Sequence, residues 1–216
     1  MSTVPKDKLV NAIAKAVELG KGRNFKQSVE LIVVLKDIDL KSQQVKIREP
    51  VYLPKGRGKE QKICVIGDSE MVEIGKSEGA YLAILGDDVK NITKKQAKKI
   101  ASSCDWVLVK PEFMGTVGRV LGPSLGPRGK IPVPVSSSSA LKGMIARYRN
   151  TVLVSLRNQP QIMASIGVED MKVEDLAENA LAVLTAIEGK LPAGYANIGK
   201  ILVKTTMGIP VEVSTR

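Results

Sequence analysis

The middle of the chain alternates short apolar runs with helical segments, and this alternation restricts the possible folds more than any other feature. The runs at 63–66, 81–85 and 105–109 have the length and composition of strands. Two of the helical segments open with good helix-start residues, Asp68-Ser69 and Thr93. Strands that alternate with helices over short connections form a parallel sheet covered on both faces. The sequence therefore predicts an α/β domain in the middle of the chain.

The two ends of the chain have a different pattern, in which strands follow one another. The expected elements are a helix over 5–19, strands over 28–36 and 45–53, strands over 151–156 and 161–166, a helix over 173–188, and strands over 199–206 and 209–214. The strands over 151–156 and 161–166 are predicted to pair with each other. Met207-Gly208 between the last two strands is a tight hairpin signal. The ends are therefore predicted to be α+β.

The simplest architecture joins the two ends into one domain that is interrupted by the α/β domain. We predict one domain from residues 1–61 and 154–216, and an inserted domain from residues 62–153. The chain would enter the insertion near 54–62 and leave it near 150–158. The first connector, residues 54–62, is flexible and basic because it combines Pro54, two glycines and four cations.

A segment rich in glycine and proline, residues 114–134, is the most distinctive local feature and is called the Gly/Pro segment below. It carries three cations, Arg119, Arg128 and Lys130, and no pair of nucleophile and base. Glycine permits close approach to a backbone or a phosphate, and proline fixes φ and removes a donor. The segment is predicted to be a loop that holds a bend and touches an anion. A hinge that binds no ligand is an alternative explanation for the composition of both the Gly/Pro segment and the first connector.

The charge of the chain points to a polyanionic partner. The formal net charge is +11, with +6 in residues 1–61, +6 in 62–153 and −1 in 154–216. An excess of this size is typical of proteins that bind nucleic acid, although a basic enzyme is an alternative. Aromatic residues make up only 3% of the chain, which argues against base stacking on single strands.

Several kinds of chemistry are excluded or disfavoured. The chain has no histidine, which excludes histidine catalysis and histidine metal ligands. Gly67-Asp68-Ser69-Glu70 matches no nucleotide fingerprint, and the pairs Asp37/Asp39 and Asp87/Asp88 are more typical of turns than of Mg²⁺ sites. We therefore expect neither a cofactor nor a metal.

The cysteines and the chain ends suggest a compartment. Cys64 and Cys104 are predicted to be two buried thiols in a reducing cytosol rather than a disulfide. No apolar run approaches the length of a membrane span, and the N-terminal residues lack a secretory apolar region. A cytoplasmic protein without membrane contact is expected.

Two basic features have a bland and a functional interpretation. Lysines 94, 95, 98 and 99 form one helix face that is either solvated or a secondary phosphate contact. The stretch from Lys204 to Pro210 carries two hydroxyls and a methionine on a hairpin beside a lysine. Such a hairpin could enter an RNA minor groove and contact 2′-hydroxyls, although its composition is that of an ordinary hairpin.

Taken together, residues 121–134, Thr205 to Gly208 and the Phe25…Ser28-Val29-Glu30 entry to the first strand resemble the family of the protein numbered one of the large ribosomal subunit, most closely its archaeal type. The resemblance implies a split α+β domain that binds ribosomal RNA and an inserted Rossmann-like three-layer α/β domain. It also implies a non-enzymatic constituent of the mobile stalk, a monomer when free of the ribosome. Its partners would be large-subunit ribosomal RNA, exit-site tRNA, whose release it aids, and its own mRNA, whose translation it represses.

The resemblance also assigns roles to residues. It places RNA contacts at Phe25, Lys26, Ser28, Glu30, Met163, Ser165, Thr205, Thr206, Met207 and Gly208. Lys200 departs from the family pattern, in which a small hydroxyl residue is frequent, and a phosphate contact would replace that hydrogen bond. Charge adds Lys36, Lys46 and Lys204 as phosphate ligands. Secondary or hinge positions are Lys55, Arg57, Lys59, Arg128 and Lys130.

One competing hypothesis belongs to another class of protein. A small α/β enzyme could use the Gly/Pro segment as a phosphate cradle. Binding of nucleotides without binding of structured RNA would favour this enzyme.

Overall fold

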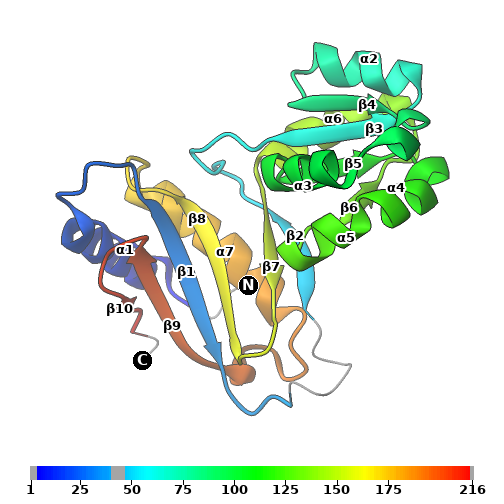
Figure 1. The fold of residues 1–216 in the computed structure, drawn as a ribbon. Helices are drawn as coiled ribbons and strands as arrows, with labels where there is room; N and C mark the ends of the chain where they lie inside the picture. Colours follow the sequence, from blue (N-terminus) through cyan, green and yellow to red (C-terminus); the bar gives the residue numbers. More distant parts are fainter. Residues whose placement is uncertain (1–3, 40–46, 215–216) are drawn as a thin grey trace. The chain divides into compact units, whose positions relative to one another are not determined.

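The computed structural model describes residues 4–39 and 47–214, and it divides the chain into two compact units (Figure 1). Unit 1 consists of Met1–Lys59 and Asn150–Arg216, and unit 2 consists of Glu60–Arg149. The sequence-based boundary at 153/154 falls inside a strand of unit 1, β7 (Thr151–Ser155).

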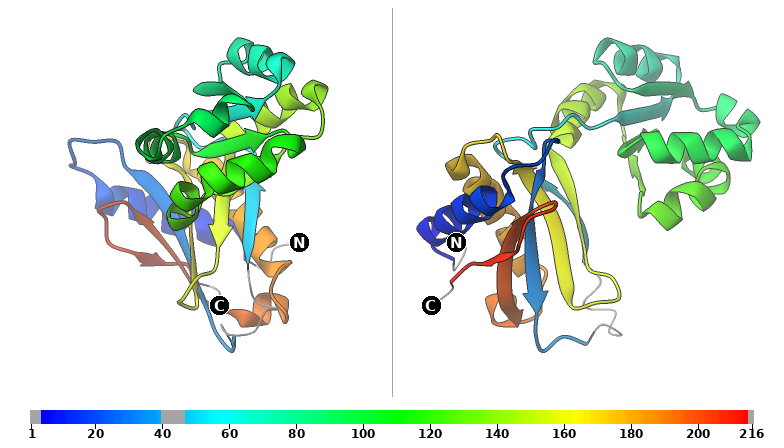
Figure 2. Two further views of the ribbon diagram at one scale, coloured as in Figure 1. Left: turned by 45° about the vertical axis from the view of Figure 1, so that its right-hand side comes forward. Right: turned by 60° about the vertical axis from the view of Figure 1, so that its left-hand side comes forward.

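The main sheet of unit 1 is antiparallel, with strand order β10-β9-β1-β8. Its strands are β1 (Ser28–Leu35), β8 (Gln161–Val168), β9 (Ile198–Thr205) and β10 (Val211–Glu212). Side chains alternate strictly along β1, so that Val29, Leu31, Val33 and Leu35 are buried. These residues form the core with two helices, α1 (Lys6–Gly20) and α7 (Val173–Glu188), which lie together on one side of the sheet (Figures 1 and 2).

The predicted pairing of the strands around residue 158 is wrong. β7 pairs with β2 (Arg48–Tyr52) in a separate two-stranded sheet, whereas β8 pairs with β1. Just before β8, the Pro160 carbonyl accepts a hydrogen bond from the Leu35 N–H at the end of β1, which continues the pairing of β8 with β1. The chain thus leaves one sheet and enters the other within a few residues.

Unit 2 is the predicted parallel α/β domain. Its sheet has the order β4-β3-β5-β6, and every pair in it is parallel. The strands are β3 (Ile63–Gly67), β4 (Leu82–Leu85), β5 (Trp106–Val109) and β6 (Pro132–Pro134), and the longer helices are α2 (Ser69–Ser77), α3 (Lys94–Ser103) and α6 (Ser138–Arg149). Helices cover both faces of this sheet, with α2 and α6 on one side and α3 on the other (Figure 1).

The helix-start signals of unit 2 act as predicted. Asp68 caps α2 by accepting a hydrogen bond from the Met71 N–H at 3.0 Å. Thr93 and Gln96 form a reciprocal capping box at the start of α3. Short 3-10 turns lie in unit 2 at Asp88–Asn91, Pro111–Phe113 and Gly126–Arg128, and a further such turn lies in unit 1 at Gly194–Asn197.

The Gly/Pro segment is more regular than predicted. Instead of a loop it forms α4 (Met114–Val120), α5 (Gly122–Leu125), a 3-10 turn and β6, the fourth strand of the parallel sheet. β6 was missed because Pro132 and Pro134 cannot donate to a sheet. The structure accommodates them because β6 lies at the edge of the sheet.

The prediction of two separate thiols is also wrong, because Cys64 and Cys104 are joined by a disulfide. Cys64 lies in β3 and Cys104 follows α3, and both are fully buried in the hydrophobic cluster between the sheet and the helices α3, α4 and α5. Their Cα atoms are 5.8 Å apart, which is within the range that a disulfide spans. The prediction considered the compartment alone and could not include this proximity.

Within the described residues, no helix is both long enough and apolar enough to cross a membrane. The same part of the chain contains no group of three or more acidic or cysteine side chains suited to a metal ion.

Candidate nucleic-acid interface

One face of the main sheet of unit 1 carries polar and partly exposed side chains, and we call it the open face. Its members alternate with the core residues and are Glu30, Ile32 and Val34 on β1, Gln161, Met163 and Ser165 on β8, and Lys200, Leu202 and Lys204 on β9. The strand register places Ser165, Glu30 and Lys204 in one row across three strands. Predicted residues far apart in sequence are thus neighbours.

The charge of Glu30 is offset by Lys204. The two side chains form an ion pair at 3.9 Å, and the Lys204 ammonium also donates to the Thr206 carbonyl at 3.1 Å. Both side chains keep part of their surface exposed. An acidic residue on a surface for RNA is therefore tolerable, since the adjacent lysine compensates it and its carboxylate can still accept from a base amine or a 2′-hydroxyl.

Three large apolar side chains are exposed at one end of this sheet. Phe25 is 50% exposed, Met207 is 59% exposed and Ile209 is 65% exposed. Phe25 precedes β1, and the other two lie in the turn between β9 and β10. We call residues 25–28 and 205–209 together the hairpin end. Exposed apolar groups beside cations are suited to contacts with the sugars or bases of a nucleic acid.

The hairpin end is held together by backbone and hydroxyl contacts. The Thr206 N–H donates to the Ser28 carbonyl at 3.0 Å, and the Thr206 hydroxyl lies within hydrogen-bond distance of both Ser28 backbone groups. The turn is tightened because the Gly208 N–H donates to the Thr205 carbonyl at 3.0 Å. Thr206 therefore joins the turn to the start of β1, as well as exposing its side chain.

Thr205 differs from its predicted neighbours because it is fully buried. It follows the buried positions Ile201 and Val203 along β9, so its side chain points toward the helices and away from the open face. Its hydroxyl has no hydrogen-bond partner among the described residues. A Cβ on Gly20 or Gly208 would overlap with this hydroxyl. In this conformation Thr205 supports the turn and cannot itself reach a ligand.

The remaining predicted residues of unit 1 are dispersed. Lys26 is at the hairpin end and forms an exposed ion pair with Asp170 at 2.8 Å. Lys36 follows the opposite end of β1, and Lys200, paired in register with Val34, lies at that end and contacts Glu212 at 3.4 Å. Lys46 lies outside the described residues.

Sequence reasoning missed the amide of Gln27, between Lys26 and Ser28. It is a buried polar side chain, 1% exposed, and it contacts the turn of the hairpin end. Its position just before β1 gave no signal, because glutamine is usually a surface residue.

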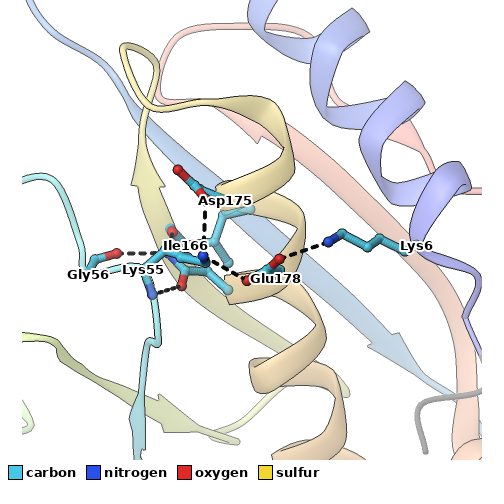
Figure 3. A network of polar contacts seen from close by, with 7 residues as sticks. Lys6, Lys55, Gly56, Ile166, Asp175 and Glu178 are labelled. Carbon is cyan, nitrogen blue, oxygen red and sulfur yellow. Dashed lines mark hydrogen bonds and ion pairs between the residues drawn. The ribbon is translucent and has the colours of Figure 1, made fainter.

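The first connector is attached to α7 rather than free (Figure 3). The Asn179 amide is fully buried; its oxygen accepts from the Lys55 N–H at 3.0 Å, and its nitrogen donates to the Gly56 and Ile166 carbonyls, each at 2.8 Å. Gly56 and Gly58 both have positive φ values, and a Cβ on Gly58 would overlap with Val168. The predicted flexible connector is therefore bonded to α7 at residues 55 and 56.

Lys55 also joins this attachment through charge. Its ammonium lies 3.3 Å from Glu178 and 3.6 Å from Asp175, and Lys6 lies 2.8 Å from Glu178 (Figure 3). Hydrogen bonding to Glu178, together with the charges of both acids, raises the pKa of Lys55. Hydrogen bonds from Lys6 and Lys55 lower the pKa of Glu178. Lys55 is therefore engaged within unit 1, as is expected of a hinge position rather than of a free cation. Arg57 and Lys59 lie in the same connector.

The cations of the Gly/Pro segment are engaged inside unit 2. The Lys130 ammonium donates to the Ala101 carbonyl at 3.1 Å and to the Cys104 carbonyl at 2.6 Å, at the C-terminal end of α3. Arg128 donates to the Ser124 carbonyl at 2.9 Å. A cation at a helix C-terminus satisfies free carbonyls and complements the helix dipole. These contacts account for Lys130 and Arg128 without any ligand.

Lys110 and Asp68 form an ion pair in unit 2 at 2.8 Å, and the pKa values of both groups are shifted. The hydrogen bond from Lys110 lowers the pKa of Asp68, and the same bond raises the pKa of Lys110. The pair joins the residue after β5 to the start of α2, so it has a structural role.

Comparison with known proteins identifies relatives over nearly the whole chain. Residues 13–209 match the model of the ribosomal protein L1p/L10e family. A protein of Staphylothermus marinus named large ribosomal subunit protein uL1 is 52% identical over 208 residues, covering 96% of this chain and 97% of its own. The proteins of the same name from Aeropyrum pernix and Hyperthermus butylicus are 52% and 46% identical; the first alignment covers 94% of this chain and 93% of the relative, and the second covers 100% of both.

Proposed function

The chain belongs to the ribosomal protein L1p/L10e family, and from this premise we propose that unit 1 binds large-subunit ribosomal RNA through its open face and hairpin end. The protein is a constituent of the large ribosomal subunit in the cytoplasm and is not an enzyme. The observation that carries the proposal is that exposed Phe25 and Met207 lie at the same end of the sheet as Lys26 and Lys204.

The chemistry of this surface suits a structured RNA. A-form helices present 2′-hydroxyls and sugars in a wide minor groove. Thr206 and Ser165 provide hydroxyls, Met207 and Phe25 provide apolar contact area, and the lysines neutralise phosphates. With two to four phosphate contacts, the slope of log affinity against log salt is roughly −2 to −4.

We test this proposal by measuring the affinity of the full chain for a transcript of the stalk region of the large-subunit ribosomal RNA from Staphylothermus marinus. Tight binding that weakens with salt is expected, while a fully paired RNA duplex of unrelated sequence binds much more weakly. Equal affinity for both RNAs would contradict a specific site on unit 1.

The competing enzyme is tested in the same titrations. A nucleotide site in unit 2 would give binding heat with ATP or GTP, and we expect none. The engagement of Lys130 with the end of α3 supports this expectation, because a phosphate cradle needs its lysine free. Nucleotide binding without RNA binding would replace our proposal with the enzyme.

Two further roles extend the proposal. If the leader of its own mRNA folds into the same RNA structure, the same surface represses translation, and the mRNA leader then competes with the ribosomal RNA transcript.

The stalk role in releasing exit-site tRNA requires unit 2 to move about its connectors. The exposed face of α3 with lysines 94, 95, 98 and 99 supports a secondary contact with tRNA phosphates. Replacing these four lysines with glutamine is expected to weaken tRNA binding and leave ribosomal RNA binding unchanged.

A further inference from the structure

Gln27 uses every polar atom of its side chain in the interior of unit 1. Its amide nitrogen donates to the Gly20 carbonyl at 2.6 Å and to the Glu169 carboxylate at 3.1 Å. Its amide oxygen accepts from the Met207 N–H at 3.0 Å. Because the side chain is only 1% exposed, it cannot contact a ligand directly.

The partners of Gln27 belong to three separate parts of the chain. Gly20 is the last residue of α1, Glu169 follows the end of β8, and Met207 is in the turn after β9. The backbone is bound as well, because the Gln27 N–H donates to Glu169 at 2.8 Å and the Glu169 N–H donates to the Gln27 carbonyl at 3.0 Å. One planar amide therefore fixes the position of the turn relative to two other segments.

The orientation of this amide is determined by its partners. Glu169 and the Gly20 carbonyl are both acceptors, so the amide nitrogen must face them and the oxygen must face Met207. A glutamate at this position would place a second carboxylate beside Glu169 and leave the Gly20 carbonyl without its donor. Glutamine is thus chemically required, and not only a side chain of this size.

A second observation supports the same arrangement. Gly20 and Gly208 both approach the buried hydroxyl of Thr205 so closely that a Cβ on either residue would overlap with it. The end of α1 and the turn therefore meet over Thr205. A displacement of the turn would leave buried polar groups of Gln27 unpaired, and such groups are costly to bury.

We propose that Gln27 is a positioning residue for RNA binding, which holds the turn so that the Met207 side chain projects from the hairpin end. The inference depends on the proposed RNA-binding function of that end. Gln27 contributes to affinity through the geometry of the turn, and Glu169 fixes the orientation of its amide.

The main test uses Gln27→Met, which keeps the length of the side chain and removes its hydrogen bonds. We expect the affinity for the stalk-region transcript to fall by on the order of tenfold, as is typical for the loss of one well-placed contact. The matched control is Asn197→Leu. Asn197 is also a buried amide with backbone partners, Ala193, Lys36 and Asp37, but it lies at the opposite end of β1. The control is expected to lower thermal stability similarly and to change RNA affinity less than about twofold.

Two readouts separate positioning from general stability. In a double-mutant cycle with Met207→Ala, the two losses of RNA affinity should be non-additive, because Gln27 acts through Met207. Hydrogen exchange at the Met207 amide should become faster in Gln27→Met and stay unchanged in Asn197→Leu. If Gln27→Met does not fold, Glu169→Gln, which loses one acceptor for the Gln27 donors, replaces it in both measurements.

The outcomes distinguish this inference from the proposed function. Failure of the unsubstituted chain to bind the transcript, or full affinity in Met207→Ala, would overturn the RNA site itself. A large loss in Met207→Ala together with unchanged affinity or additive behaviour in Gln27→Met would overturn only the positioning role.

Discussion

Two regions of this protein combine glycine with basic residues, the hairpin end of unit 1 and the Gly/Pro segment of unit 2, and they use these residues in opposite ways. In the Gly/Pro segment, Lys130 and Arg128 donate to backbone carbonyls of their own unit. At the hairpin end, Phe25 and Met207 remain exposed beside Lys26. Distinctive sequence therefore marks a structural element in one region and a candidate ligand surface in the other. The difference is that Lys130 and Arg128 bind backbone carbonyls of their own unit, whereas Lys26 forms only an exposed ion pair with Asp170.

The largest expected effect distinguishes the glycines of the two regions. Gly208→Ala would place a Cβ against the buried Thr205 hydroxyl, and overpacking of this kind costs about 1–3 kcal/mol of the free energy of unfolding. Gly118→Ala in α4 has open space around its Cβ and should instead stabilise unit 2 by about 0.5–1 kcal/mol. Denaturant unfolding of both variants measures this, and effects of the same sign would contradict the comparison.

RNA affinity provides the second comparison. Met207→Ala removes the exposed apolar side chain and should weaken binding to the ribosomal RNA transcript by about tenfold or more. Arg128→Ala should change the affinity less than about twofold, since its guanidinium is bonded to Ser124 in unit 2. Equal losses of affinity in a gel-shift titration would contradict the assignment of the main RNA-binding site to unit 1.

The third comparison uses two lysines, one of which is expected to affect the stability of its unit and the other the affinity for RNA. Lys130→Met leaves the carbonyls at the end of α3 without a cation and should cost unit 2 about 1–2 kcal/mol without changing RNA binding. Lys26→Met removes only an exposed ion pair, so it should leave stability within about 0.5 kcal/mol. It should, however, reduce the salt slope of RNA binding by about one. Unfolding and salt titrations of both variants decide the matter.

The smallest effect concerns acid sensitivity in the two units. Glu178 in unit 1 and Asp68 in unit 2 both have lowered pKa values, because each accepts hydrogen bonds from lysine. A carboxyl group with a lowered pKa stabilises the fold at pH values above its ordinary pKa, which is 4.5 for this glutamate and 3.8 for this aspartate. This contribution is lost as the pH falls through the lowered pKa.

Glu178→Gln should therefore be less stable than the unsubstituted chain at neutral pH, with the difference shrinking toward acid. Thermal unfolding measured from pH 7 to pH 3 tests this. A difference that stays constant across the range would show that the ion pairs of Glu178 do not contribute. Asp68→Asn provides the corresponding measurement for unit 2.

Much of the local structure follows from the sequence alone. The apolar period along residues 173–188 predicts α7 with its observed bounds, and Thr93 predicts the start of α3. The turn around Met207-Gly208 is also predicted by local sequence, although β9 ends at Thr205 and β10 begins at Val211, both farther from the turn than predicted. Even the burial of Thr205 has a sequence signal, because it continues the alternation of Ile201 and Val203. The roles in RNA binding assigned to the hairpin end and the open face stay predictions.

The tertiary structure alone determined which segments meet. Periodicity gives β7 and β8 as strands, but only packing decides that they belong to different sheets. The Cys64–Cys104 disulfide, the Asn179 contacts with the connector and the Gln27 contacts with the turn all join residues whose proximity the sequence does not encode. The physical reason is that a helix or strand is specified by neighbours along the chain, whereas a buried amide or a disulfide depends on where distant segments end.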